Sequence, residues 1–221
     1  MDTSLNFYNY ISTKKIVFWD FDGVIKDSVE VKTNAFRELF RSFGEEVMDK
    51  VTMHHVNNGG MSRFKKIPIY LSYAGIEPSE NIINEFCNQF AVLVEDAVVN
   101  SNWVPGVLQV INNCKKENQH FVLVTATPQD EIERILTRLN IINIFSNIFG
   151  SPMTKSDAIN FCLKLYNVNS KDSIMIGDSI ADFEASQKTG SDFLLRRTPE
   201  NLISMKHFTG NVINNFIENE K

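Results

Sequence analysis

The sequence has few cysteines, and they do not follow the spacing of a cross-linked or metal-bound scaffold. Cys87, Cys114 and Cys162 are the three present, and they stand far apart without any CxxC spacing. This distribution argues against both a disulfide framework and a structural zinc site. We expect the three thiols to be reduced and partly buried.

Long apolar runs and basic clusters are also missing. The longest apolar runs, such as residues 90–94 and 121–124, fall far short of a membrane span. The first fifteen residues lack the basic segment, apolar segment and cleavage signal of a secreted protein. With 27 acidic and 22 basic residues the net charge is −5, and there is no basic run to follow a nucleic-acid backbone. We therefore expect a soluble, cytoplasmic protein that binds neither membrane nor nucleic acid.

What the sequence does contain is four short, continuously apolar runs, at residues 15–19, 121–124, 173–176 and 192–195. Each run is apolar throughout rather than alternating, which is typical of a parallel sheet covered on both faces, and helix-like segments separate the later runs. The chain has 221 residues, of which 43% are hydrophobic, enough for a sizeable core. These features predict an α/β fold with a doubly wound, Rossmann-like parallel sheet.

A long insertion separates the first apolar run from the second. About a hundred residues lie between them, far more than a strand-to-strand crossover needs. Apolar residues recur there every three to four positions, at 35–43 and again at 82–97, which indicates helices. We therefore predict a helical cap domain over residues 28–100, inserted into an α/β core that is formed by residues 1–27 and 101–221.

Two acids directly follow the first apolar run, in the segment Asp20-Phe21-Asp22-Gly23. Open α/β sheets bind ligands at the carboxyl ends of their strands. Residues i and i+2 of an extended segment share a face, and Gly23 lets the backbone turn close to a ligand. Two such acids can divide nucleophilic and proton-transfer roles, although the pattern alone also suits two acids that only cap a polar turn.

Two further polar residues stand where a strand ends or a helix starts. Thr125 follows the second apolar run, where its hydroxyl and nearby backbone N–H groups suit a phosphate. We predict that Thr127, followed by Pro128, is the N-cap of the next helix. Lys155 is expected as the first residue of a helix capped by Thr154. A lysine there opposes the helix dipole, so a phosphate oxygen or a carboxylate is its expected partner.

A second acid pair, Asp178 and Asp182, follows the third apolar run. Asp182 is explained by a capping box with Ser179, but Asp178 is not. Together with Asp20 and the carbonyl of Asp22, Asp178 would supply oxygen ligands to a hard divalent cation. Magnesium suits a few carboxylates completed by waters and a substrate phosphate.

These elements, in this order, resemble the haloacid dehalogenase (HAD) superfamily over residues 16–195. The place of the insertion, before Thr125, resembles the helical-cap branch that contains phosphoglycolate phosphatases and β-phosphoglucomutases. The resemblance implies a Mg²⁺ cofactor, with Asp20 as the nucleophile and Asp22 as the general acid/base. The phosphate ligands that it implies are Thr125, Ala126 and Lys155. The residues that it implies around the metal are Asp20, Asp22, Asp178 and Asp182.

The implied activity is magnesium-dependent hydrolysis of a small phosphate monoester through an aspartyl-phosphate. The substrate would be a sugar, polyol or hydroxy-acid phosphate, and the protein a monomer or homodimer. The segment Gly60-Met61-Ser62-Arg63 resembles the GxSR segment of several relatives. Arg63 would then bind a substrate carboxylate or hydroxyls, or it would face water while Ser62 caps a helix. We expect Lys66 and the pair His54-His55 to lie on the surface.

Two alternatives stay open. One is a phosphosugar mutase similar to β-phosphoglucomutase, and the other is a non-catalytic module that binds a phosphorylated metabolite. After Thr125 the chain lacks the lysine that the mutase pattern places there, which favours hydrolysis. It also lacks the Asn-Lys pair common at this point in phosphoglycolate phosphatases. None of the residues that the resemblance makes essential is missing, which disfavours the non-catalytic alternative.

Overall fold

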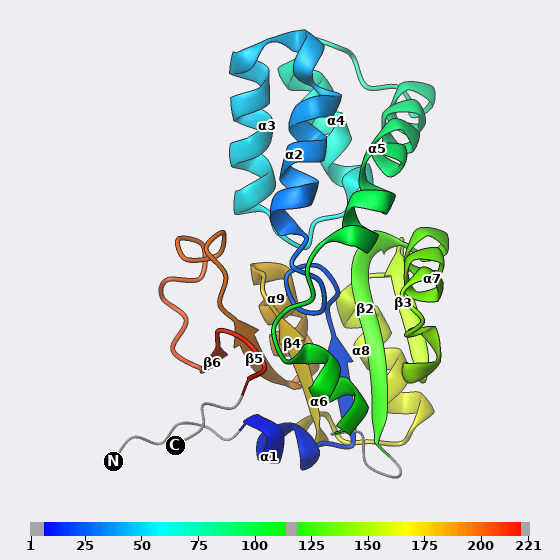
Figure 1. Ribbon diagram of the computed structural model, residues 1–221, viewed down its shortest axis with the longest axis vertical. Helices are drawn as coiled ribbons and strands as arrows, with labels where there is room; N and C mark the ends of the chain where they lie inside the picture. Colours follow the sequence, from blue (N-terminus) through cyan, green and yellow to red (C-terminus); the bar gives the residue numbers. More distant parts are fainter. Residues whose placement is uncertain (1–6, 114–118, 218–221) are drawn as a thin grey trace.

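The computed structural model describes residues 7–113 and 119–217, and its centre is a six-stranded parallel sheet (Figure 1). The strands are β1 (Ile16–Trp19), β2 (His120–Pro128), β3 (Asn147–Ser151), β4 (Ser173–Gly177), β5 (Asp192–Arg196) and β6 (Asn211–Ile213). Their order is β3-β2-β1-β4-β5-β6, and every pairing is parallel. The chain therefore winds outward in both directions from β1, which confirms the predicted doubly wound fold.

Helices cover both faces of the sheet. One face carries α1 (Phe7–Ser12), α6 (Val107–Asn113) and α7 (Gln129–Arg138), and the other carries α8 (Lys155–Leu165) and α9 (Ile180–Thr189). Short 3-10 turns stand at Arg41–Phe43, Ile142–Ile144 and Ser170–Asp172. Along β1, Val17 and Trp19 join one apolar cluster while Ile16 and Phe18 join the other. Both faces are buried at this strand, which is why the β1 sequence is apolar throughout.

Four helices, α2 (Val29–Leu39), α3 (Glu45–Asn57), α4 (Arg63–Tyr73) and α5 (Glu80–Asn100), stand together beyond the carboxyl ends of the strands (Figure 1). We call them the cap helices. Aromatic rings hold them together: Phe36 stacks on Phe90 with centroids 3.9 Å apart and meets Tyr70 edge-on at 5.3 Å. Their apolar cluster continues into the sheet face under α7. The four helices span the interval predicted for the cap, and their independence as a domain stays a prediction.

Two chain segments connect the cap helices to the sheet and run side by side. Val104 donates its N–H to the carbonyl of Ile25 at 3.0 Å. The Lys26 ammonium lies 4.4 Å from the Trp103 ring centroid and donates to the Val99 carbonyl at the end of α5. The start of the cap is thereby tied to the turn that carries Asp20 and Asp22.

The second strand differs from its prediction. It runs to Pro128 instead of ending at residue 124, with a register shift against β3 on the way. Helix α7 consequently starts at Gln129 with Pro128 in the N-cap position, and the predicted Thr127 cap is wrong. The physical reason is that Thr127 is still in extended backbone, where its hydroxyl reaches the carboxylate of Asp22.

The cysteines that the structure describes agree with the sequence expectation. Cys87 and Cys162 are free and buried, and burial raises their thiol pKa to about 11 and about 12. Cys114 lies outside the described residues. Among the helices in residues 7–113 and 119–217, none combines the length and apolar character needed to cross a lipid bilayer.

Candidate active site

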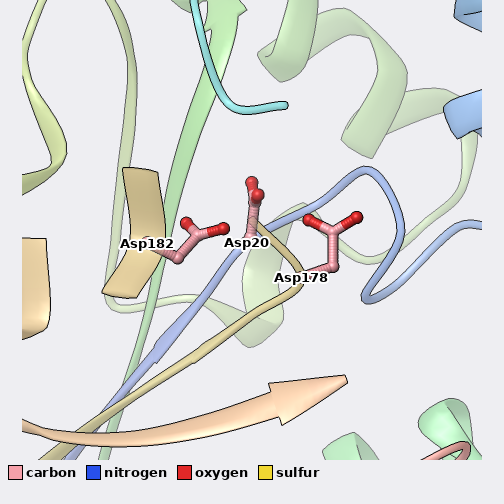
Figure 2. Close-up of side chains that lie close together, drawn as sticks. All are labelled: Asp20, Asp178 and Asp182. Carbon is pink, nitrogen blue, oxygen red and sulfur yellow. The ribbon is translucent and has the colours of Figure 1, made fainter. Parts of the chain in front are cut away.

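Three buried carboxylates meet where the two central strands of the sheet end. Asp20 follows β1 and Asp178 follows its neighbour β4, while Asp182 lies in the first turn of α9. Figure 2 shows Asp20 between the other two side chains. One oxygen from each carboxylate lies within 4.8 Å of the others. This is the point where the winding direction of the sheet changes, the usual ligand crevice of a doubly wound fold. We call these three side chains the acidic cluster.

A tight turn brings Asp20 close to Asp178. Gly23 adopts a φ of +76°, and its N–H donates to the Lys26 carbonyl at 2.8 Å. A Cβ atom added to Gly23 would lie 2.2 Å from Oδ2 of Asp178. The glycine is therefore needed both for the backbone conformation and for the space that the carboxylate occupies.

Lys155 supplies the positive charge of the cluster. It is the first residue of α8, where Thr154 caps the helix by accepting from the Asp157 N–H, as predicted. Its ammonium lies 2.7 Å from Asp20 Oδ2 and also contacts Asp182. Burial opposes the charged form, but the carboxylates of Asp182 and Asp20 outweigh it and raise the pKa of Lys155. The lysine is thus a permanent cation beside the proposed nucleophile.

Asp182 has two roles at once. Its Oδ2 accepts from the Ser179 hydroxyl at 2.6 Å and from the Ser179 N–H at 3.1 Å, which completes the predicted capping box. Its Oδ1 accepts from Lys155. The capping interaction therefore holds Oδ2 of the carboxylate, while Oδ1 contacts Lys155 next to Asp20.

The acidic cluster holds more negative charge than Lys155 can balance. Burial, followed by the charge of Asp182, raises the pKa of Asp20 to about 7 against the opposing effect of Lys155. Burial and the charge of Asp20 hold the pKa of Asp178 well above its ordinary value. Within residues 7–113 and 119–217, the Asp178 carboxylate has no hydrogen-bond donor. Buried hard oxygen ligands with surplus negative charge are a donor set that fits Mg²⁺.

Asp22 is not one of the three carboxylates of the acidic cluster, and its side chain makes a separate set of polar contacts. The Ser28 hydroxyl donates to its Oδ1 at 2.6 Å, while the Lys32 ammonium and the Thr127 hydroxyl contact its Oδ2. Burial alone would raise the pKa of Asp22, but Lys32, Ser28 and Thr127 together lower it. The Asp22 side chain is therefore ionised and lies outside the cluster, and its carbonyl as a metal ligand stays a prediction.

The expected phosphate ligands share one cavity. Thr125, Ala126 and Lys155 line a space of about 570 Å³ between the loop at residues 57–62 and the ends of the core strands. Thr125 lies within β2 rather than directly after its end, because the strand runs on to Pro128, and its hydroxyl accepts the N–H of Thr127 at 3.2 Å. Lys155 lines the cavity and contacts Asp20 and Asp182 of the acidic cluster, so it connects the two.

Arg63 is buried against the core. Its guanidinium lies 2.5 Å from Glu131 Oε1 on α7 and 4.6 Å from the Phe90 ring centroid. The neighbouring Ser62 hydroxyl contacts the Ser151 hydroxyl at 3.0 Å. The alternative in which Arg63 faces water is wrong, because the side chain is buried and pairs with Glu131 at the start of α7. Contact between Arg63 and a substrate stays a prediction.

Several residues of the site escaped the sequence interpretation. Lys66 and His55 are buried rather than solvated, and Lys32, Ser28 and Thr127 surround Asp22. The sequence did contain a sign of the role of Lys32. Lys32 stands three residues before Ala35 and four before Phe36, so this charged residue falls on the buried face of α2. Nothing in the sequence indicated the roles of Ser28 and Thr127, because short polar residues are common in turns.

The fold and the site together define a doubly wound α/β protein with an acidic cluster at the point where the winding direction of the sheet changes. Residues 17–195 match the model of the haloacid dehalogenase-like hydrolases, and the chain belongs to this family. The resemblance drawn from the motifs is thereby confirmed.

Relatives with assigned activities are distant. A phosphoglycolate phosphatase of Pseudomonas putida is 25% identical over 186 residues, which cover 80% of this chain but 66% of that protein, just under two thirds of its length. A phosphorylated carbohydrates phosphatase of Thermotoga maritima is 25% identical over 179 residues, covering 79% of this chain and 81% of its own. The crystal structure of a β-phosphoglucomutase from Clostridium difficile superposes with a TM-score of 0.72 at 22% identity, covering 92% of both chains.

Proposed function

We propose that this protein is a magnesium-dependent phosphatase that hydrolyses a small phosphate monoester through an aspartyl-phosphate on Asp20. The observation that carries the proposal is the setting of Asp20. Its carboxylate is buried, lies 2.7 Å from the Lys155 ammonium, and stands beside Asp178 and Asp182. Lys155 also lines the cavity that contains Thr125 and Ala126. A phosphate bound there would meet a nucleophile, a cation and helix-start N–H groups together.

The first chemical step is attack of an Asp20 carboxylate oxygen on phosphorus. The new O–P bond forms as the bond to the alcohol oxygen breaks, and Asp22, after taking up a proton from solvent, gives that proton to the alcohol oxygen. Water then attacks the acyl phosphate, gives a proton to Asp22, and releases inorganic phosphate with Asp20 restored. Ionised Asp22, held by Lys32 and two hydroxyls, matches the second step, in which Asp22 acts as a base.

Charge on the transferring phosphate needs compensation. Lys155 and the Thr125 hydroxyl would stabilise its oxygens directly. Asp20, Asp178 and Asp182, with the carbonyl of Asp22, would hold Mg²⁺, which when bound neutralises charge on the phosphate oxygens. The surplus negative charge and the raised pKa of Asp178 support this assignment.

Two observations support the proposed substrate class: the names of similar proteins and the size of the cavity. The names of the two similar phosphatases, for phosphoglycolate and for phosphorylated carbohydrates, support a small hydroxy-acid, sugar or polyol phosphate. The cavity of about 570 Å³ has room for such a molecule. The partner would therefore be a small phosphorylated metabolite.

The test is phosphate release from a panel of these esters, with Mg²⁺ or with EDTA, for wild type and Asp20→Asn. Release should require Mg²⁺ and fall at least about a thousandfold in the variant, because the nucleophile is gone. Asp49→Asn, an exposed acid on α3, is the matched control and should retain activity. Turnover by Asp20→Asn would refute the assignment. An isomerised product without free phosphate would favour the mutase, and binding without turnover would favour the binding module.

A further inference from the structure

The segment at the end of β5 contacts both of the turns that carry the acidic cluster. Arg196 is the last residue of β5 and Asn201 lies shortly after it, and both side chains are buried. Arg196 contacts the turn after β1, and Asn201 contacts the turn after β4. Neither residue takes part in the chemical steps proposed for hydrolysis, so these contacts with the site need a separate explanation.

The side-chain amide of Asn201 makes three hydrogen bonds, all of them to the backbone. Its Nδ2 donates to the Asp178 carbonyl at 2.7 Å and to the Arg196 carbonyl at 2.8 Å, while its Oδ1 accepts the Thr198 N–H at 3.0 Å. Both donors of the amide are thereby used, and a rotated amide would direct its oxygen at two carbonyl oxygens. Asn201 therefore holds the backbone of Asp178 in a fixed position relative to the end of β5.

The guanidinium of Arg196 holds the other turn. Its Nη1 donates to the Gly23 carbonyl at 3.2 Å and pairs with Asp27 at 3.1 Å, and its Nε donates to the Asn214 carbonyl at 3.2 Å. Gly23 is the residue at which an added Cβ would lie 2.2 Å from Oδ2 of Asp178. Arg196 thus fixes the turn against which the Asp178 carboxylate packs.

The Asp178 carboxylate depends on this support more than its neighbour in the cluster does. Asp182 is oriented by hydrogen bonds from Ser179 and Lys155. The Asp178 carboxylate, among the residues that the structure describes, has no hydrogen-bond donor of its own. Its place is therefore set by its own backbone and by the Gly23 turn. Removing a residue that orients a metal ligand typically weakens metal binding about 10- to 100-fold.

We propose that Asn201, supported by Arg196, is a positioning residue for the metal site, which sets the affinity for Mg²⁺ by fixing Asp178 relative to the Gly23 turn. This inference rests on the proposed function, in which Asp178 is a ligand of Mg²⁺. The Asn201 amide acts through the Asp178 backbone and would touch neither metal nor substrate. The effect should fall on metal affinity rather than on the chemical step, because Asp20 keeps its contact with Lys155.

Calorimetric titration of Mg²⁺ into the full chain measures this effect apart from turnover. Asn201→Ala should weaken Mg²⁺ binding about 10- to 100-fold. Thr198→Ala is the matched control, because the Thr198 hydroxyl accepts the Asn201 N–H at 3.1 Å in the same buried turn. That variant loses this bond but keeps the bonds of the Asn201 amide to Asp178 and Arg196. It should lower stability in urea unfolding and change Mg²⁺ affinity less than about threefold.

The Mg²⁺ dependence of phosphate release gives a second measurement. Half-maximal release by Asn201→Ala should need about 10 to 100 times more Mg²⁺, while the rate at saturating Mg²⁺ should stay within about threefold of wild type. If the alanine variant does not fold, Asn201→Ser replaces it. Serine keeps an oxygen for the Thr198 N–H but can donate only one hydrogen bond, so Mg²⁺ binding should still weaken at least about fivefold.

Two results would overturn the positioning role. One is unchanged Mg²⁺ affinity in the folded Asn201 variant, and the other is an equal loss of affinity in Thr198→Ala, which would assign Asn201 to stability alone. A fall in the rate at saturating Mg²⁺ without a change in affinity would contradict it as well. A wild-type protein that binds no Mg²⁺ would instead refute the proposed metal-dependent function, and the positioning role with it.

Discussion

At the scale of single residues, Gly23 shows how closely the acidic cluster depends on the absence of a side chain. The residue combines a left-handed φ with a position where an added Cβ would lie only 2.2 Å from the Asp178 carboxylate. Gly75 shares the positive φ, at +73°, but its added Cβ would meet nothing within 4 Å. A comparison of substitutions at the two glycines therefore distinguishes the effect of backbone strain from the effect on the acidic cluster.

Gly23→Ala should lower both stability and activity, whereas Gly75→Ala should lower stability alone. Both changes place a Cβ at positive φ, at a cost of about 1–2 kcal/mol in the free energy of unfolding. Only Gly23→Ala displaces Asp178, so phosphate release should fall at least about a hundredfold, in line with the loss of a group that supports charge in the transition state. Urea unfolding and phosphate-release assays on both variants test this. Equal activity in the two would show that the cluster tolerates the added methyl group.

Among secondary-structure elements, the short helix α1 has one of its contacts with the sheet through a carboxylate of β5. Asp192, the first residue of β5, accepts from the Tyr10 hydroxyl at 2.8 Å and also contacts the Lys14 ammonium. Burial opposes the charged form of Asp192, but Lys14 and Tyr10 outweigh it and lower its pKa. Burial, followed by Asp192, raises the pKa of Tyr10 to about 12, so its hydroxyl remains a donor at neutral pH.

Asp192→Asn should lower stability at pH 7 by about 1 kcal/mol, the size of a partly exposed charge-assisted contact. Because the folded pKa of Asp192 lies below its unfolded value near 3.9, its contribution is complete above that value and is lost as the pH falls through the folded pKa. The difference from wild type in urea unfolding should therefore shrink below about pH 4. The exposed pair Asp172–Lys15 gives the control Asp172→Asn, with a change below about 0.5 kcal/mol. A difference independent of pH would refute the electrostatic origin.

At the scale of the whole molecule, polar contacts dock the cap helices on the core. Arg63 pairs with Glu131 in a buried contact, and the Arg138 of α7 pairs with Asp96 on the surface at 2.7 Å. On the opposite side Gly60 approaches α9 so closely that a Cβ would lie 2.7 Å from the Ser179 hydroxyl. The cap thus contacts the core on two sides, through ion pairs with α7 and through the close approach of Gly60 to the start of α9.

Removing one partner of the buried pair should cost more than removing both. Glu131→Gln leaves a buried guanidinium unpaired and should lower the free energy of unfolding by about 3–5 kcal/mol, as should Arg63→Met. The double variant Arg63→Met with Glu131→Met should cost clearly less than the sum of the single changes. Asp96→Asn, in the exposed pair, should cost less than about 1 kcal/mol. Additive losses in urea unfolding would show that the two side chains do not act as a buried pair.

How much of this could be predicted from the sequence differs between elements. The continuous apolar runs predicted β1, β2, β4 and β5, because strands buried on both faces contain little else. β3 and β6 were missed, since their sequences, Asn-Ile-Phe-Gly-Ser and Asn-Val-Ile, are short and partly polar edge segments. Local spacing also predicted the caps at Thr154 and Ser179, because an N-cap depends on residues within three positions of each other.

The sequence by itself determined the fold class, the family, and the positions of Asp20, Asp22 and Asp178 after strand ends, because parallel strands bring their carboxyl ends to one edge. It also placed Lys155 at the first position of a helix. Only the tertiary structure decided the partners of the cap side chains. Arg63 meets Glu131, Lys32 meets Asp22, and Lys66 remains without an acid among the described residues. Such pairings depend on how helices far apart in the chain are packed. The spacing of apolar residues in a helix predicts which face of the helix is buried, but it does not predict which residues that face contacts.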